Sequence, residues 1–184
     1  MKALDTYLQN VRIKKAKKFI RKNDAVLDIG SVDGVMFDKW KEIISYSYGI
    51  DPILKQEIKK DNYTLLPGKF PEDIPENLTF NAITMLAVLE HIPQEVQEEM
   101  SQGFYNLLKP KGRVIITVPS PQVDFILEVL LKLKLIDGMS LEEHYGFKPS
   151  DTEKLFSKGF KLIEKRKFQL GLNNLYVFEK LDKI

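Results

Sequence analysis

The stretch that most constrains the fold is residues 26–34, which read V-L-D-I-G-S-V-D-G. Its apolar start predicts a buried strand with Asp28 near the carboxyl end, and Gly30 and Gly34 then bracket a tight turn. Apolar residues recur at helical spacing directly afterwards, which predicts a helix. Open parallel sheets present a loop to a ligand in this way, because glycine lets the backbone approach closely. We therefore expect a ligand crevice at this turn.

A second acid, Asp51, closes the next apolar stretch at 46–50. An acid about 20 residues beyond such a turn can accept hydrogen bonds from a ribose diol. The alternative is that Asp51, which stands directly before Pro52, only caps a helix. The glycine turn upstream favours ribose binding.

Composition limits the chemistry that the chain can perform. It has no cysteine, which excludes disulfides, thiolate nucleophiles and cysteine-ligated metal, and its two histidines leave little for a metal site, so we expect none. The formal net charge of +2 does not by itself indicate nucleic acid. The sequence contains neither a leader peptide pattern nor a run of about 18 apolar residues. We therefore expect a cytoplasmic protein without a membrane span.

Strand and helix patterns alternate along the chain, with no linker or repeat to divide it. They predict one α/β domain over residues 1–184, a Rossmann-like, doubly wound and mostly parallel seven-stranded sheet with a C-terminal antiparallel hairpin. Strands are expected at 25–27, 46–50, 63–66, 80–89, 113–118, 159–168 and 175–181. Helices are expected at 2–22, 35–44, 52–58, 96–108, 122–136 and 150–157.

The expected N-terminal helix carries seven basic residues opposite its apolar face. We call them the basic cluster: Arg12, Lys14, Lys15, Lys17, Lys18, Arg21 and Lys22. Such a cluster can bind nucleic acid or anionic lipid, but more often it is simply solvated. We interpret it as a solvated helix face and expect no nucleic-acid partner.

Four motifs stand in a characteristic order, and together they resemble the class I S-adenosylmethionine-dependent methyltransferases over nearly the whole chain. The first is the glycine turn at 26–34 and the second is G-I-D at 49–51. The third is A-V-L-E-H-I-P at 87–93 and the fourth is L-L-K-P-K-G-R-V-I-I-T-V-P at 107–119. The closest resemblance is to members that act on small molecules, whose extra segment before the last helix covers the substrate. Here that segment is residues 120–148.

The resemblance implies S-adenosylmethionine as the cofactor and assigns candidate site residues. Those for cofactor binding are Asp28, Gly30, Ser31, Gly34, Asp51, Lys69, Phe70, Leu86 and Ala87. The sequence departs from the family at Val32, where a third glycine is common, and at Lys69, where an acid often meets the adenine. His91 and His144 are candidates for deprotonating the acceptor, because histidine titrates near neutrality, although either can be merely structural.

We thus expect methyl transfer from S-adenosylmethionine to an oxygen or nitrogen of a small molecule. One alternative is an RNA or protein methyltransferase that docks its substrate through the basic cluster. Another is a non-catalytic cofactor-binding module that holds a partner with the apolar helix at 122–136. A dehydrogenase is less consistent, because the turn lacks G-x-G-x-x-G spacing. Neither the acceptor nor the oligomeric state follows from the sequence.

Overall fold

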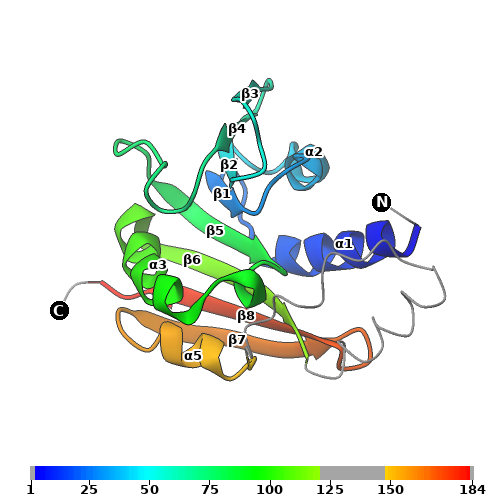
Figure 1. Ribbon diagram of the computed structural model, residues 1–184, viewed down its shortest axis with the longest axis vertical. Helices are drawn as coiled ribbons and strands as arrows, with labels where there is room; N and C mark the ends of the chain where they lie inside the picture. The colour runs from blue at the N-terminus through cyan, green and yellow to red at the C-terminus, as the bar shows by residue number, and fades with distance from the viewer. Residues whose placement is uncertain (1–2, 121–147, 183–184) are drawn as a thin grey trace.

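The computed structural model describes residues 3–120 and 148–182, which share one eight-stranded sheet (Figure 1). The strand order is β3-β4-β2-β1-β5-β6-β8-β7. The strands are β1 Val26–Ile29, β2 Ser47–Asp51, β3 Ile58–Lys59, β4 Tyr63–Pro67, β5 Phe80–Leu86, β6 Leu108–Pro119, β7 Phe160–Phe168 and β8 Asn173–Lys180. The helices are α1 Ala3–Ala16, α2 Val35–Trp40, α3 Gln94–Leu107 and α5 Asp151–Leu155, with 3-10 turns η1 Lys17–Phe19 and η2 Leu89–His91.

The pairing confirms the predicted architecture. From β4 through β2, β1 and β5 to β6 every neighbouring pair is parallel, whereas β8 is antiparallel to both β6 and β7. The late hairpin is thus antiparallel, as its short connection predicts. No helix within the described ranges has the length and apolarity to cross a bilayer.

Side chains alternate across the sheet and divide the core into two layers, because successive strand residues point to opposite faces. Leu27 and Ile29 pack with α3 and with Phe156, which follows α5, on the face that carries these helices in the foreground of Figure 1. Val26 packs instead with α1 and α2. The second layer is built on the helix residues Ile13, Ala16, Met36, Phe37 and Trp40. Asp28 alternates with Leu27 and Ile29 and so belongs to the α1 and α2 face.

The parallel strands end at one edge of the sheet, where α/β folds bind their ligands. Asp51 ends β2 and is paired with Pro67 at the end of β4. Leu86 ends β5 and Pro119 ends β6. Because β8 is antiparallel, its first residue, Asn173, lies opposite Pro119 at the same edge. The candidate residues of the first three motifs therefore converge there, together with Leu86.

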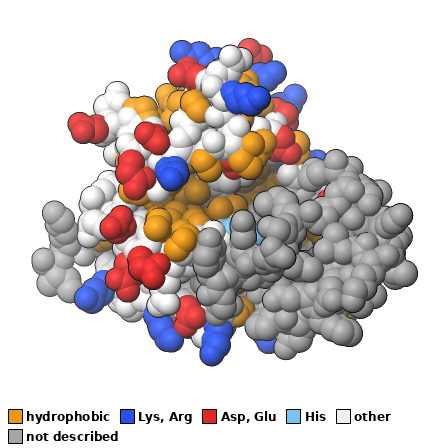
Figure 2. All heavy atoms as spheres, viewed as in Figure 1, with side chains coloured by type: hydrophobic (Ala, Val, Ile, Leu, Met, Phe, Trp, Pro, Cys, Tyr) orange, Lys and Arg blue, Asp and Glu red, His pale blue; other side chains and the backbone are white. Residues whose placement is uncertain are grey.

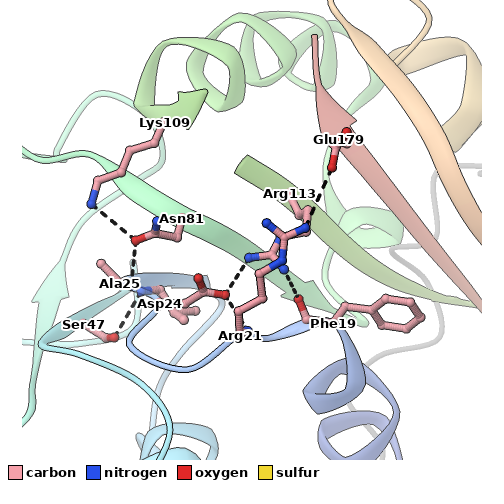
Figure 3. A network of polar contacts seen from close by, with 10 residues as sticks. Phe19, Arg21, Asp24, Ala25, Ser47, Asn81, Lys109, Arg113 and Glu179 are labelled. Carbon is pink, nitrogen blue, oxygen red and sulfur yellow. Dashed lines mark hydrogen bonds and ion pairs between the residues drawn. The ribbon is translucent and has the colours of Figure 1, made fainter. Parts of the chain in front are cut away.

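The opposite edge is held by a buried ion pair (Figure 3). Arg113 Nη2 lies 2.6 Å from Asp24 Oδ2, and the two side chains are only 4% and 6% exposed. Arg113 Nη1 also donates to the carbonyl oxygen of Phe19, and the amide of Arg21 donates to Asp24. This network fixes the end of the N-terminal helical segment to β6, so α1 and η1 extend from the ligand edge toward the opposite edge.

The expected helix at 52–58 is wrong. The amide of Ile53 donates to Asp51 Oδ1 and the amide of Leu54 donates to the Asp51 carbonyl, which closes a turn. Pro52 stands at the second position of this turn, which suits its fixed φ. The chain then forms the short strand β3, antiparallel to β4, and this is the eighth strand of the sheet.

Other element boundaries also differ from the expected ones: α2 ends at Trp40 and not at residue 44, β6 begins at Leu108 and not at residue 113, and α5 ends at Leu155 and not at residue 157. The α-helix expected to reach residue 22 ends at Ala16 and continues only as η1. The strand expected at 80–89 ends at Leu86, because Ala87 takes a φ of 60°, outside the extended range. In α3, the apolar Val96 is 39% exposed, whereas the polar Gln97 is buried. The helix expected at 122–136 lies outside the described residues.

Candidate functional site

The glycine turn after β1 has the backbone that the sequence predicts. Gly30 and Gly34 have φ of 84° and 68°, which favour glycine. A Cβ on Gly30 would collide with the side chain of Val88, and one on Gly34 would collide with the ring of Tyr63. The amides of Gly30 and Ser31 both donate to the Ile50 carbonyl, at 2.9 and 3.3 Å. The turn is therefore fixed against the end of β2.

Asp28 is buried beside this turn and has hydrogen-bond partners both in the turn and on the neighbouring strand β5. Thr84 Oγ1 of β5 donates to Asp28 Oδ1 at 2.6 Å. Burial raises the pKa of Asp28 to about 7, the carboxylates of Asp33 and Asp51 add to this, and hydrogen bonds from Thr84 and Ser31 oppose it. Such a carboxyl group ionises most readily when a positive group binds next to it.

Asp51 lies at the tip of β2 with 6% of its surface exposed. Its Oδ1 accepts the Ile53 amide at 2.8 Å, so it does cap a structure, although this is a turn and not a helix. One carboxylate oxygen thus fixes the loop. This is compatible with the expected ribose contact, which would use the other oxygen.

The segment after β4 lies next to Asp51, because the amide of Gly68 donates to the Asp51 carbonyl. Lys69 is exposed, and its amide donates to Asp73. The ring of Phe70 is 6% exposed and stacks on Phe104 with 4.8 Å between centroids. The structure therefore places the Phe70 side chain in the core and leaves Lys69 at the edge.

The third motif follows β5 at the same edge. Leu86 and Ala87 are half-buried, and the amide of Ala87 donates to Thr117 of β6. Glu90 is only 3% exposed, and His91 is half-buried in η2. His144 and the expected substrate-covering segment lie outside the described residues.

Helix α1 covers this edge, which the sequence did not predict. Gln9 Nε2 donates to Asp33 Oδ2 at 3.2 Å, and Arg12 Nε donates to Asn173 Oδ1 at 3.4 Å. Arg12 is half-buried, so its assignment to a solvated basic face is wrong. Burial lowers the pKa of its guanidinium, while the nearby carboxylates of Glu90 and Asp5 act to raise it.

A cavity of about 60 Å³ lies between α1 and the glycine turn. Its described lining comprises Gln9, Arg12, Ile13, Asp28, Ile29, Gly30, Ser31, Asp33, Met36 and Leu86. This volume can hold about four to six water-sized groups. Figure 2 shows apolar side chains gathered in the middle of the face that carries α3.

A larger cavity of about 650 Å³ lies between α3 and α5. Its described lining includes Gln97, Ser101, Tyr105, Lys154 and Leu155, and none of the expected cofactor residues. It therefore lies away from the glycine turn and the acids. We place the candidate site at the smaller cavity, where the strand ends converge.

The structure thus brings Asp28, Gly30, Ser31 and Leu86 around one cavity, and Asp51 lies close enough to affect the pKa of Asp28. Sequence reasoning missed Thr84 and Arg12. Arg12 is spaced four residues from both Leu8 and Ala16, so it interrupts the apolar stripe, and this was the available signal. Thr84 carried no such signal, because a threonine in a strand is ordinary.

Comparisons with known proteins agree with this geometry. The sequence model of a family described as methyltransferase domain matches residues 4–163. A search of proteins with curated functions finds no match in sequence.

Among solved structures, the fold is similar to that of the N-methyltransferase NodS from Bradyrhizobium japonicum WM9. The identity is 11%, the match covers 97% of this chain and 99% of that chain, and the TM-score is 0.68. A chain of the complex between the Haloferax volcanii Trm112 methyltransferase activator and a putative methyltransferase is 13% identical, with a TM-score of 0.71. This match covers 99% of this chain and 95% of that chain. Magnesium protoporphyrin IX methyltransferase from Synechocystis PCC 6803, with bound S-adenosylhomocysteine, is 16% identical, with a TM-score of 0.63. This match covers 95% of this chain and 82% of that chain. At these identities the likeness shows the fold alone.

Proposed function

The chain belongs to the methyltransferase domain family and is an S-adenosylmethionine-dependent methyltransferase, and from this premise we propose that its acceptor is a small molecule methylated on oxygen or nitrogen. The observation that carries the proposal is the position of α1. Gln9 and Arg12 of this helix contact residues of the glycine turn and of β8, so the helix narrows the ligand edge of the sheet. A narrowed edge suits a small acceptor better than a polymer.

The residues at this edge fit the cofactor. Its methionine part carries an ammonium group, which needs a carboxylate, and Asp28 lies in the cavity wall. Its ribose offers two hydroxyl donors, and Asp51 lies buried at the strand tip. The turn can pack closely against Val88 only because residue 30 is glycine, since a Cβ added there would collide with the Val88 side chain. We therefore assign cofactor binding to this edge, with Ser31, Gly34, Lys69, Leu86 and Ala87 around it.

The cofactor supplies a methyl group that is already activated by the positively charged sulfur next to it. The protein must therefore align the acceptor in line with that group and exclude water. An oxygen or nitrogen acceptor loses a proton as it is methylated, and His91, half-buried in η2 after β5, is the described candidate to accept it. His144 remains a second candidate.

The position of the basic cluster argues against a polymer substrate. Lys14, Lys17 and Lys18 are exposed, and beyond Arg12 the chain proceeds toward the Arg113–Asp24 pair at the opposite edge of the sheet. A polyanion bound to these lysines would lie away from the glycine turn. The continuous sheet also supports the proposal that the chain forms one domain.

Two experiments test the proposed function. Calorimetric titration with S-adenosylhomocysteine and, in parallel, NAD should show binding of the first ligand only. Incubation of the protein with methyl-labelled S-adenosylmethionine and a cell extract, followed by ultrafiltration, should place the label in the small-molecule fraction. Label in the RNA or protein fraction would overturn the small-molecule proposal, and binding of NAD alone would contradict the cofactor assignment.

A further inference from the structure

Arg12 occupies an unusual place for a surface-helix arginine. It contributes to the wall of the cavity that also contains Asp28 and Gly30. Its Nε donates to Asn173 Oδ1, and Asn173 Nδ2 in turn donates to Gln169 Oε1 at 2.6 Å. Within the described residues, its two terminal nitrogens have no hydrogen-bond partner. The Asn173 contact therefore orients the guanidinium, and no described residue accepts a hydrogen bond from its terminal nitrogens.

The charged side chains in the described wall of the cavity are mostly acidic, and Arg12 is the exception. Asp28 and Asp33 line the cavity, and Asp51 lies close enough to raise the pKa of Asp28. Among the described lining residues, Arg12 is the one cation. Of the charged groups in the described wall, Arg12 alone would attract a ligand group with a negative charge, and the carboxylates would repel it.

The size of the cavity indicates which part of a ligand it would hold. About 60 Å³ accommodates about four to six water-sized groups. An amino-acid head group, with its nitrogen, α-carbon and carboxylate, is of this size and carries one positive and one negative charge. The acid and the arginine in the wall match these two charges.

We propose that Arg12 binds the carboxylate of the cofactor's methionine part, while Asp28 takes the ammonium group. The proposal rests on the proposed function, because it takes S-adenosylmethionine as the ligand. Arginine suits the role, since its planar guanidinium can give a carboxylate two parallel hydrogen bonds, whereas lysine is a point charge. Helix α1 then supplies a cofactor-binding residue as well as narrowing the ligand edge of the sheet.

The competing interpretation is that Arg12 serves only the fold. Glu90 is buried close enough to raise the pKa of Arg12, and removing one member of a buried charged pair destabilises a protein. This interpretation predicts that substitutions at Arg12 lower the melting temperature and affect all ligands equally. The carboxylate-binding role predicts an effect that depends on the ligand.

The test compares two ligands on four proteins by calorimetry. The ligands are S-adenosylhomocysteine and its decarboxylated analogue, which keeps the adenosine, the sulfur and the amine. The proteins are wild type, Arg12→Gln, Arg12→Lys and, as a matched control, Lys14→Gln on the exposed face of the same helix. Melting temperatures of all four report any effect on folding.

Wild type and Lys14→Gln should prefer S-adenosylhomocysteine over the analogue by about ten- to a hundredfold, the range for charged hydrogen bonds. Arg12→Gln should bind both ligands equally and bind the analogue at least as well as wild type does. Arg12→Lys should retain part of the preference, and it decides the question if Arg12→Gln does not fold.

An undiminished preference in both Arg12 variants would overturn the proposal, and so would an equal loss of affinity for both ligands. Failure of wild type to bind S-adenosylhomocysteine at all would instead refute the proposed function. The two failures are therefore distinguishable.

Discussion

The pKa of Asp28 makes cofactor binding depend on pH in a calculable way. With a pKa of about 7, only about one Asp28 side chain in eleven is ionised at pH 6, against about nine in ten at pH 8. The ammonium group of S-adenosylhomocysteine binds the ionised form. The affinity should therefore be about tenfold weaker at pH 6 than at pH 8.

Calorimetry in two buffers of different ionisation enthalpy measures this directly. Binding at pH 6 should release about one proton, and binding at pH 8 almost none. In Asp28→Asn, which can still accept the Thr84 hydrogen bond, both the pH dependence and the proton release should disappear. Asp33→Asn is the matched control, because Asp33 is exposed and its loss should only move the midpoint of the titration to lower pH. An equal affinity of wild type at both pH values, or an unchanged pH dependence in Asp28→Asn, would refute the reasoning.

The same carboxyl group affects the unfolding free energy without ligand. Its pKa is raised in the folded chain from 3.8 to about 7, so the folded chain keeps a proton that the unfolded chain has already released. The contribution of protonated Asp28 to the unfolding free energy is therefore fully present below about pH 4 and is lost as the pH rises to about 7. Between pH 5.5 and pH 8, the wild-type melting temperature should fall relative to that of Asp28→Asn. A parallel pH dependence of the two proteins would contradict the assigned pKa.

Three further predictions concern other parts of the molecule. Asp51→Asn keeps the oxygen that accepts the Ile53 amide, so calorimetry should find S-adenosylhomocysteine binding about tenfold or more weaker at an unchanged melting temperature, whereas Asp51→Ala should also lose about 1 kcal/mol of stability. Wild-type affinity in both variants would contradict the ribose assignment. Arg113→Met leaves Asp24 as a buried, unpaired charge and should cost about 3–5 kcal/mol in urea unfolding. Much of this loss should be recovered in Asp24→Asn/Arg113→Met, and a loss in the double variant as large as in Arg113→Met, or larger, would contradict this assignment. RNA should not bind at physiological salt; a salt-dependent complex that is lost when the exposed lysines of the basic cluster become glutamine would show the opposite.

The local sequence was sufficient for the fold class and for the glycine turn. Alternating strand and helix patterns predict a parallel sheet, and parallel strands necessarily bring Asp28, Asp51 and Leu86 to one edge. Gly30 and Gly34 could be identified because a positive φ is a property of the local backbone. These features depend on neighbours in the sequence or on rules that hold for every sheet of this class.

Other features were decided only by contacts between distant segments. Pro52 is compatible with both a helix start and a turn, and the Asp51 side chain together with pairing between β3 and β4 selects the turn. Arg12 has the composition of a solvated helix residue, and it becomes a wall of the site only because α1 packs across the sheet and places it beside Asn173. The pKa of Asp28 likewise depends on burial and on partners as far away in the chain as Thr84. Burial and charge pairing are properties of the packed molecule, which is why the sequence could name the acids of this site but not its arginine.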